Sequence, residues 1–277
     1  MHIGLLLKQV PKVMTTGADG LMDRSGKSMI NPYCKHALEE AIKLKETIKS
    51  LGKESDITVM SMGPPNFEQS LRQAISIGAD SMYLLSDRKL AGSDTMATAK
   101  ALSKLIQKIE EERGWKFDVL FAGLQTVDGD TAHVPAQIAE RLKFNQVTYV
   151  EKLEYLEDKN TLKVRRMIEK GYMELEVPFP TVLTVTNVAN IPRGPKLSGL
   201  MKATGSKLDK MKMVQLNIKS ISDLDLKPEE VGLNGSPTVV AKVRVVQSSR
   251  PPIKIAEGEN IIETVENLIF LMKEEAN

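Results

Sequence analysis

The sequence predicts an α/β fold, in which an open, mostly parallel β-sheet carries helices on both faces. Over the first two thirds of the chain, short apolar and β-branched runs alternate with amphipathic segments, the pattern of a parallel sheet with crossover helices. Apolar residues in the intervening segments recur at helical spacing, as Ala101, Leu105 and Ile109 do. Strands connected in this way are joined by right-handed crossovers.

The predicted elements alternate along this part of the chain. Strands are expected at residues 3–7, 57–61, 82–85 and 119–122, and helices at residues 32–51, 65–77, 95–112 and 131–142. Residues 12–30 are polar and contain turn-forming glycines, which indicates a hairpin inserted between the first strand and the first helix.

The pattern changes after residue 146. Four strands are expected at residues 147–153, 162–168, 172–177 and 181–186, forming an antiparallel extension of the sheet. Residues 191–199 are rich in turn formers, and residues 216–254 contain only short apolar pieces, so this tail needs a partner to pack on. Residues 260–272 are again helical in pattern, and their apolar stripe packs either on their own domain or on another subunit.

Composition excludes several classes of protein. A chain of 277 residues can form one large domain, or a domain of about 190 residues with appendages. The 38 Lys and Arg residues nearly balance 36 Asp and Glu, and aromatic residues make up 4%, which disfavours a nucleic-acid partner. With a single cysteine, Cys34, no intramolecular disulfide can form, and a reducing, cytoplasmic location is expected. We expect no basic export leader and no apolar stretch near the roughly 20 residues of a membrane span.

Common catalytic and cofactor motifs are absent from the sequence. Residues 20–28 resemble a P-loop but have one residue too many between the glycines and lie in the predicted hairpin. No GxGxxG or GxSxG motif follows a predicted strand. His2, His36 and His133 are too far apart in sequence to predict a zinc site. Cys34 is expected to be a small buried residue rather than a nucleophile.

Polar or small residues follow several of the predicted strands. They lie at residues 8–11, 62–65 and 123–126, and residues 92–95 form a fourth polar corner at the start of the third helix. Because open parallel sheets bind ligands beyond the carboxyl ends of their strands, these corners together predict a crevice.

The segment GLQTVDGDTAHV, residues 123–134, forms the strand-to-helix turn of this crevice. Gly129 permits a positive φ angle, and Asp130 or Thr131 can cap a helix whose first free N–H groups belong to residues 131–134. These N–H groups and the helix dipole favour an anion. Asp128 and Asp130 would then turn toward ribose hydroxyls or back onto backbone donors. The alternative is a well-capped helix without a ligand.

The chain resembles the β subunit of electron transfer flavoproteins over nearly its full length. The resemblance rests on a series of motifs in the same order and at the right spacing: KQVP, INPYCKHALEEAIKLKE, VMSMGPP, AISIGAD, GSDTMATA, GLQTVDGDTA and PRGPKLSGLMKA. It implies a Rossmann-like, adenine-nucleotide-binding fold and an α subunit that carries FAD. In many members the β subunit holds a structural AMP, and in an electron-bifurcating branch the same pocket holds a second FAD.

The stretch DGDTA is similar to the bifurcating branch, because Gly129 and Ala132 leave room for a larger ligand than AMP, so FAD is favoured. The resemblance implies no catalytic side chain and no metal. Two residues depart from the bifurcating pattern: His133 stands where glutamine is common, and Pro135 where glycine is common. The cofactor contacts that the resemblance implies are Leu6, Lys8, Asn31, Met62, Gly63, Asp94, Thr95, Gly123, Gln125, Thr126, Asp128, Gly129, Asp130, Thr131, Ala132, His133 and Val134.

The resemblance also implies a division of the chain. Residues 1–189 would form the nucleotide- or flavin-binding domain, residues 190–211 a recognition loop with a following helix, and residues 212–277 an arm that wraps the α subunit. In the recognition loop, at residues 192–201, Leu197 corresponds to the leucine that inserts into a partner dehydrogenase.

The function expected from this resemblance is electron bifurcation. FAD in the crevice would take a hydride from NADH and divide the electrons between ferredoxin or flavodoxin and the α-subunit FAD, which serves a dehydrogenase or quinone reductase. One alternative is a non-bifurcating β subunit with AMP, which carries electrons from acyl-CoA-type dehydrogenases. Alternatives of other classes are a nucleotide-binding hydrolase or ligase and a regulatory AMP-binding module.

Overall fold

The computed structural model describes residues 1–13, 15, 26–205, 212–240 and 255–275. The chain divides into two compact units, Met1–Val243 and Arg244–Asn277. In the second unit the described residues include helix α6 (Ile261–Glu275), so the helix expected at residues 260–272 is confirmed. Over the described ranges, no helix is both long enough and apolar enough to cross a membrane.

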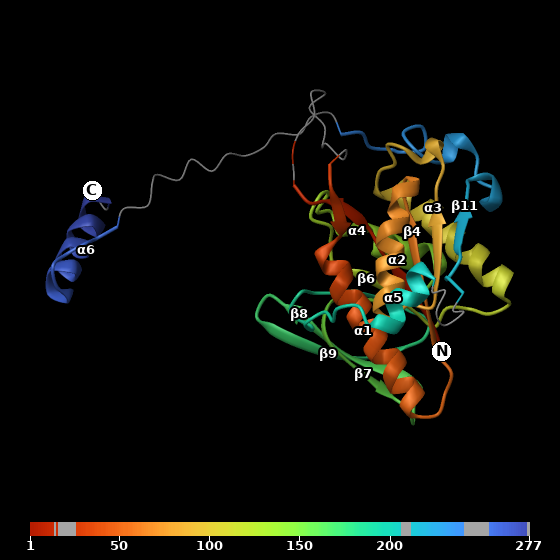
Figure 1. Ribbon diagram of the computed structural model, residues 1–277, viewed down its shortest axis with the longest axis horizontal. Coiled ribbons are helices and arrows are strands. Elements are labelled where there is room, and N and C mark those ends of the chain that lie inside the picture. Colours follow the sequence, from red (N-terminus) through yellow and green to blue (C-terminus); the bar gives the residue numbers. More distant parts are fainter. Residues whose placement is uncertain (14, 16–25, 206–211, 241–254, 276–277) are drawn as a thin grey trace. The chain divides into compact units, whose positions relative to one another are not determined.

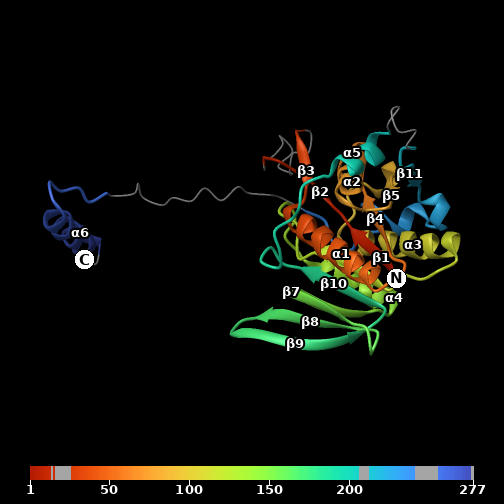
Figure 2. The ribbon, with the colours of Figure 1, turned by 60° about the horizontal axis from the view of Figure 1, so that its bottom comes forward.

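The first unit is built on a nine-stranded sheet (Figures 1 and 2). The strand order is β11-β5-β4-β1-β6-β10-β7-β8-β9, and every neighbouring pair from β11 to β7 is parallel. The predicted α/β class and the open, mostly parallel sheet are therefore confirmed. The strands are β1 (His2–Leu6), β4 (Asp56–Met62), β5 (Ser81–Leu85), β6 (Val119–Gly123), β7 (Asn145–Leu156), β8 (Thr161–Ile168), β9 (Gly171–Pro178), β10 (Thr181–Val185) and β11 (Leu216–Lys219).

Helices cover both faces of this sheet (Figure 2). On one face α1 and α2 bury residues such as Leu38 and Leu71 against Ile3 and Val59, and on the other α3 and α4 cover Met60. Burying apolar strand residues on both faces is the main source of stability in such a fold. The helices are α1 (Pro32–Ser50), α2 (Glu68–Ile77), α3 (Thr95–Arg113), α4 (His133–Leu142) and α5 (Leu197–Thr204), with 3₁₀ turns at η1 (Pro65–Phe67), η2 (Arg88–Leu90), η3 (Ser222–Leu224) and η4 (Pro228–Glu230).

Two expectations about the second half of the chain were wrong. Only β7, β8 and β9 form an antiparallel extension, because β10 returns to lie between β6 and β7 and runs parallel to both. The tail after residue 216 also contributes a strand, since β11 pairs with β5 at the other edge of the sheet. This part of the tail therefore packs on its own domain.

The hairpin expected at residues 12–30 is confirmed at its two ends. Strands β2 (Gln9–Pro11) and β3 (Ser28–Ile30) pair in antiparallel fashion, and residues 14 and 16–25 of the predicted hairpin lie outside the described part. Helix α5 packs closely on α2. A Cβ at Gly199 of α5 would lie 2.0 Å from the carbonyl oxygen of Ser76 in α2. Arg72 of α2 donates a hydrogen bond of 2.7 Å to the Ala203 carbonyl oxygen near the end of α5.

Candidate functional site

The predicted crevice lies at the carboxyl ends of β1, β4 and β6. Four residues named from the sequence are linked there, because Asn31 bonds to Gln125 and Lys8 to Asp128 in the segment that follows β6. Helix α4, which this segment enters, contacts the start of α3, where Gln137 Nε2 donates to Thr95 Oγ1 at 3.3 Å. The polar segments at residues 8–11, 92–95 and 123–126 thus lie together at the carboxyl ends of the strands, as expected for an open parallel sheet.

Asn31 holds the segment after β6 in place through its side chain. The residue is 0% exposed. Its Nδ2 donates to the Gln125 carbonyl oxygen at 2.8 Å, and its Oδ1 accepts from the Val127 backbone N–H at 3.2 Å. Its own backbone N–H donates to the Lys8 carbonyl oxygen at 2.9 Å. Asn31 therefore joins the end of β1, the start of α1 and the turn before α4.

An ion pair joins the segments that follow β1 and β6. Lys8 Nζ lies 2.8 Å from Asp128 Oδ1; the side chain of Asp128 is 0% exposed, while that of Lys8 is 42% exposed. A buried carboxylate is tolerated when it is paired and hydrogen-bonded. The Asp128 side chain is thus buried against Lys8, a side-chain partner that differs from the ribose hydroxyls and backbone donors expected from the sequence.

The start of α4 differs from the sequence prediction. The helix begins at His133 rather than at residue 131, its N-cap position is Ala132, and no side chain caps it. The positive φ angles fall on Asp130 (53°) and Ala132 (56°) and not on Gly129. Because the left-handed turn at Ala132 delays the helix by two residues, neither Asp130 nor Thr131 stands at the cap position. Such conformations cost non-glycine residues about 1–2 kcal/mol each.

Hydrogen-bonding groups therefore remain available around the uncapped helix end. Within the described part of the chain, five side chains of this turn form no hydrogen bond or ion pair: Gln125, Thr126, Asp130, Thr131 and His133. Side-chain bulk is also low, since the only atom within 4 Å of a Cβ built at Gly129 is Thr126 Oγ1, at 3.7 Å. An uncapped helix N-terminus beside a lysine suits an anionic group, because the dipole and the free N–H groups favour negative charge.

The other named residues lie around this edge with largely structural contacts. Leu6 is buried in the core, and Met62 packs against the same cluster. A Cβ at Gly123 would lie 2.8 Å from the backbone of Tyr33 and Cys34, and one at Gly63 would lie 2.4 Å from the ring of Phe67. These two glycines therefore allow close approach of neighbouring segments. Val134, in the first turn of α4, packs against the core cluster beneath that helix.

Asp94 caps α3 and also binds a segment that the sequence did not connect to it. Its Oδ1 accepts from the Ala97 N–H at 2.9 Å, and its Oδ2 accepts from the Thr238 N–H and hydroxyl at 3.1 and 2.8 Å. Its own N–H donates to Ser236 Oγ at 2.8 Å. Sequence reasoning missed Ser236 and Thr238, which lie far along the chain and carry no motif.

The remaining residues singled out from the sequence have other contacts. Leu197 is 75% exposed as the first residue of α5, so the described part of the predicted loop ends in a helix. His2 pairs with Asp56 and His36 with Asn190, both distant from His133. Cys34 is buried, as expected. Over the described residues, no group of three or more His, Cys, Asp or Glu side chains could hold a metal ion.

Comparison with known proteins identifies the family. Residues 19–215 match the model of the electron transfer flavoprotein domain. The electron transfer flavoprotein subunit beta of Thermoanaerobacterium thermosaccharolyticum is 44% identical over 277 residues, covering 97% of this chain and 96% of the relative. The chain belongs to the electron transfer flavoprotein β-subunit family. Membership implies a role in electron transfer, an α-subunit partner and an association with flavin.

Two further β-subunit relatives have more specific names. Caffeyl-CoA reductase-Etf complex subunit CarD of Acetobacterium woodii is 38% identical and covers 99% of this chain and 98% of the relative. Protein FixA of Azotobacter vinelandii is 38% identical and covers 88% of this chain and 83% of the relative.

We predict that Asn31→Ala destabilises the protein by about 1–3 kcal/mol, because it leaves the partly buried Gln125 carbonyl and Val127 N–H without their partner. Urea unfolding of the variant measures this change. Asn66→Ala is the matched control, since Asn66 is exposed and forms no side-chain hydrogen bond in the described part of the chain. Equal stability of the two variants would contradict the bracing role.

Asp94 predicts a pH dependence of stability. Burial raises the pKa of Asp94, but hydrogen bonds from Ala97 and Thr238 outweigh it, so the pKa lies below the usual 3.8. Because the folded pKa is the lower one, the ionised carboxylate stabilises the fold fully above pH 3.8, and this contribution disappears as pH falls through the folded pKa. Asp94→Asn should therefore be less stable than the original protein near neutrality, by about 0.5–1 kcal/mol.

Urea unfolding of both proteins over a series of pH values measures the difference. The gap should stay constant from neutral pH down toward 3.8 and close below it. A gap that persists unchanged in strong acid would show that the charge of Asp94 has no part in the stabilisation.

Proposed function

We propose that this chain is the β subunit of an electron-bifurcating electron transfer flavoprotein and that its crevice holds FAD. The electrons come from NADH and are divided between a low-potential acceptor, such as ferredoxin or flavodoxin, and the FAD of the α subunit. That second FAD serves a partner dehydrogenase or quinone reductase. We place this activity in the cytoplasm.

One observation carries the proposal: the first turn of α4 is uncapped and is surrounded by unpartnered polar side chains and by little bulk. Ser, Thr, Asp and Asn are the preferred N-cap residues, because such a cap contributes about 1 kcal/mol. Here Ala132 occupies that position although Asp130 and Thr131 are the residues just before it. The free donors therefore fit the pyrophosphate of a dinucleotide.

The neighbouring residues have distinct roles in this proposal. The backbone N–H groups of His133 and Val134 bind phosphate oxygens, and Lys8 neutralises the buried Asp128, so that this carboxylate does not repel them. Asn31 fixes the position of the turn and of Gln125. Gly129, where the nearest atom to a built Cβ is Thr126 Oγ1, and the small Ala132 suit a ligand larger than AMP. When bound, FAD supplies the redox chemistry, and the protein contributes binding, orientation and electrostatics.

The residues proposed to contact the cofactor, or to shape its site, are those named from the sequence: Leu6, Lys8, Asn31, Met62, Gly63, Asp94, Thr95, Gly123, Gln125, Thr126, Asp128, Gly129, Asp130, Thr131, Ala132, His133 and Val134.

One relative supports a reductase as the partner of the complex. CarD is named as a subunit of a caffeyl-CoA reductase-Etf complex. We extend the comparison to the division of this chain: residues 1–189 form the cofactor domain, residues 190–211 present Leu197 to a partner dehydrogenase, and residues 212–277 contact the α subunit. The exposure of Leu197 and of the apolar residues Ile262, Leu268 and Ile269 of α6 supports the two contacts.

The cofactor content of the protein tests the proposal. The chain is co-expressed with its α subunit, the complex is purified, and the nucleotides released by denaturation are separated and quantified. We expect two FAD per heterodimer and a flavin absorbance that NADH bleaches. One FAD and one AMP per heterodimer would instead identify the non-bifurcating alternative, and release of phosphate from an added nucleotide would indicate a hydrolase.

Thr131→Glu separates an anion site from a helix end that serves stability alone. A carboxylate at this exposed position should stabilise the start of α4 by about 0.3–1 kcal/mol through the helix dipole. It should also repel the cofactor phosphates and weaken cofactor binding about tenfold or more. Thr131→Gln, of the same size but uncharged, is the control.

The measurements are urea unfolding of the apoprotein and nucleotide content of the purified complex. We expect Thr131→Glu to give a more stable apoprotein and a complex depleted of one nucleotide, with the α-subunit FAD retained. Full nucleotide content in Thr131→Glu would show that the first turn of α4 does not hold the phosphates.

A further inference from the structure

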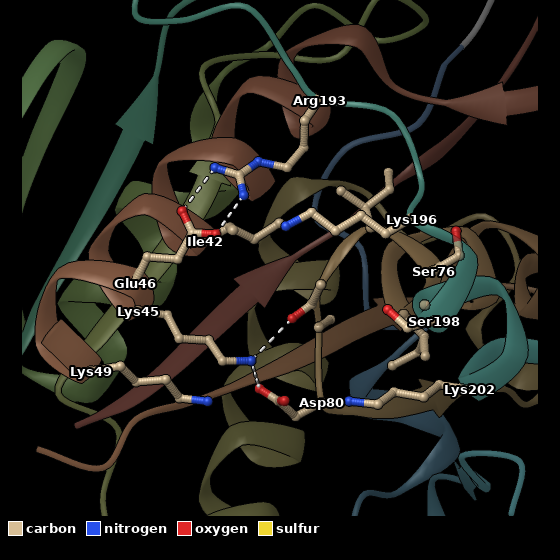
Figure 3. Close-up of a pocket in the computed structure, with 15 residues that line it drawn as sticks. Ile42, Lys45, Glu46, Lys49, Ser76, Asp80, Arg193, Lys196, Ser198 and Lys202 are labelled. Carbon is tan, nitrogen blue, oxygen red and sulfur yellow. Dashed lines mark hydrogen bonds and ion pairs between the residues drawn. The ribbon is translucent and has the colours of Figure 1, made fainter. Parts of the chain in front are cut away.

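A cavity lies at the opposite end of the parallel strands from the crevice. It has a volume of about 240 Å³ and is enclosed by the second half of α1, the end of α2 and the start of α5 (Figure 3). Its floor contains Asp80, which directly precedes β5 and accepts the Ile57 backbone N–H of β4 at 2.7 Å. The cavity therefore lies near the amino ends of β4 and β5, whereas the crevice lies at the carboxyl ends of the strands.

Cationic side chains converge on this cavity from two walls. Figure 3 shows Lys45 and Lys49 extending from α1, and Lys196 and Lys202 extending from the segment that contains α5. Arg193 lies at the upper rim of the same view. Together these residues bring five positive charges to one hollow.

The carboxylates of the cavity are already neutralised. Lys45 pairs with Asp80 and also donates to the Gly78 carbonyl oxygen at 3.1 Å. Arg193 binds both Glu39 and Glu46, at 2.9 and 2.6 Å. The hydrogen bond from Arg193 also lowers the pKa of Glu46, so this carboxylate stays ionised and keeps the guanidinium occupied. Neither Lys45 nor Arg193 is therefore available to an incoming ligand.

Three lysines of the cavity have no close ion pair among the described residues, although Lys196 interacts electrostatically with Glu46. Lys49, Lys196 and Lys202 form no ion pair or side-chain hydrogen bond within the described part of the chain. Counting Glu39 with the lining residues, five cations face three carboxylates, so two positive charges are uncompensated. The first turn of α5 adds partial positive charge beside them, because its N-cap, Lys196, makes no side-chain cap and leaves the Ser198 and Gly199 N–H groups free.

We propose that this cavity is a binding site for a small multivalent oxyanion of the phosphate class. Lysine ammonium groups act as separate point charges, which suit a tetrahedral anion approached from several sides. The planar guanidinium that would favour a carboxylate is already bound to Glu39 and Glu46. A volume of about 240 Å³ accommodates phosphate or pyrophosphate, or the phosphoryl end of a larger metabolite.

The proposal is independent of the cofactor in the crevice. The two sites lie at opposite ends of the strands and share no residue, so substitutions in the cavity leave the uncapped end of α4 unchanged. Cofactor content, quantified in the same samples, therefore reports on the crevice, while binding of added anion reports on the cavity. Failure of either proposal can be recognised without the other.

The test is a calorimetric titration of the purified αβ complex, with its bound cofactors, using sodium pyrophosphate at about 0.1 M ionic strength. Because the cofactors stay bound, the added anion is offered the cavity and not the crevice. We expect saturable binding of one pyrophosphate per heterodimer. Lys49→Gln and Lys202→Gln should each weaken it about fivefold or more, and the double variant should abolish it.

Lys104→Gln is the matched control, since Lys104 is an exposed lysine of α3 with no ion pair in the described ranges. It should leave pyrophosphate affinity unchanged. Titration with sodium phosphate, and with sodium chloride at matched ionic strength, separates the phosphate class from general screening. Heat changes that chloride reproduces, or an equal loss in Lys104→Gln, would overturn the proposal, as would the absence of saturable binding to the original protein.

Discussion

The hydrogen bonds of the Asn31 side chain hold together the carboxyl edge of the sheet. This buried amide binds the backbone on both sides of Thr126, while the Asn31 backbone binds the end of β1. The donor and acceptor of a buried amide are both satisfied only when the partner backbone groups lie in fixed positions. The Asn31 side chain therefore specifies the path of the turn as well as stabilising it. Asp128, the left-handed residues and the start of α4 all follow this turn in the chain, and their placement depends on it.

Positive charge has different sources at the carboxyl and amino ends of the parallel strands. At the carboxyl edge the charged groups are few, and the buried Asp128 is paired with Lys8, so the free backbone donors of α4 dominate the local field. At the amino edge the backbone contributes less, and lysines on α1 and α5 supply the positive charge around the cavity. Backbone donors in fixed positions suit a ligand that must be oriented, whereas flexible lysines suit an anion whose charge alone is recognised.

Much of the fold could be predicted from the sequence, because the central strands are short apolar runs between helices with clear periodicity. The strand order could not be predicted at β10, since residues 181–185 form a short strand directly after three antiparallel ones and nothing local gives its direction. Only pairing with β6 and β7 fixes their direction. Strand β11 has four residues and a partly exposed pattern, so its pairing with β5 carries almost no local signal.

The meeting of the polar corners could be predicted from the sequence, but their contacts could not. The segments after β1 and β6 lie together as expected, because topology alone brings the carboxyl ends of parallel strands together. The bracing by Asn31 and the contact of Asp94 with Thr238 depend on segments distant in sequence. The capping prediction failed for a local reason: Asp130 and Thr131 are good capping residues, but the chain turns left-handed at Ala132 after passing them.

That failure is informative about what the turn is for. A stability-optimised sequence would put glycine or asparagine at the left-handed positions and a capping residue at the helix start, each change contributing about 1 kcal/mol. In this chain the left-handed residues are Asp130 and Ala132, and Ala132 also occupies the N-cap position of α4. Both kinds of stabilisation are therefore missing within three residues. A strained turn that leaves helix donors free is compensated when a ligand binds those donors and not before. The local instability is therefore an argument for a bound anion at α4, because packing alone gives no reason to keep this turn.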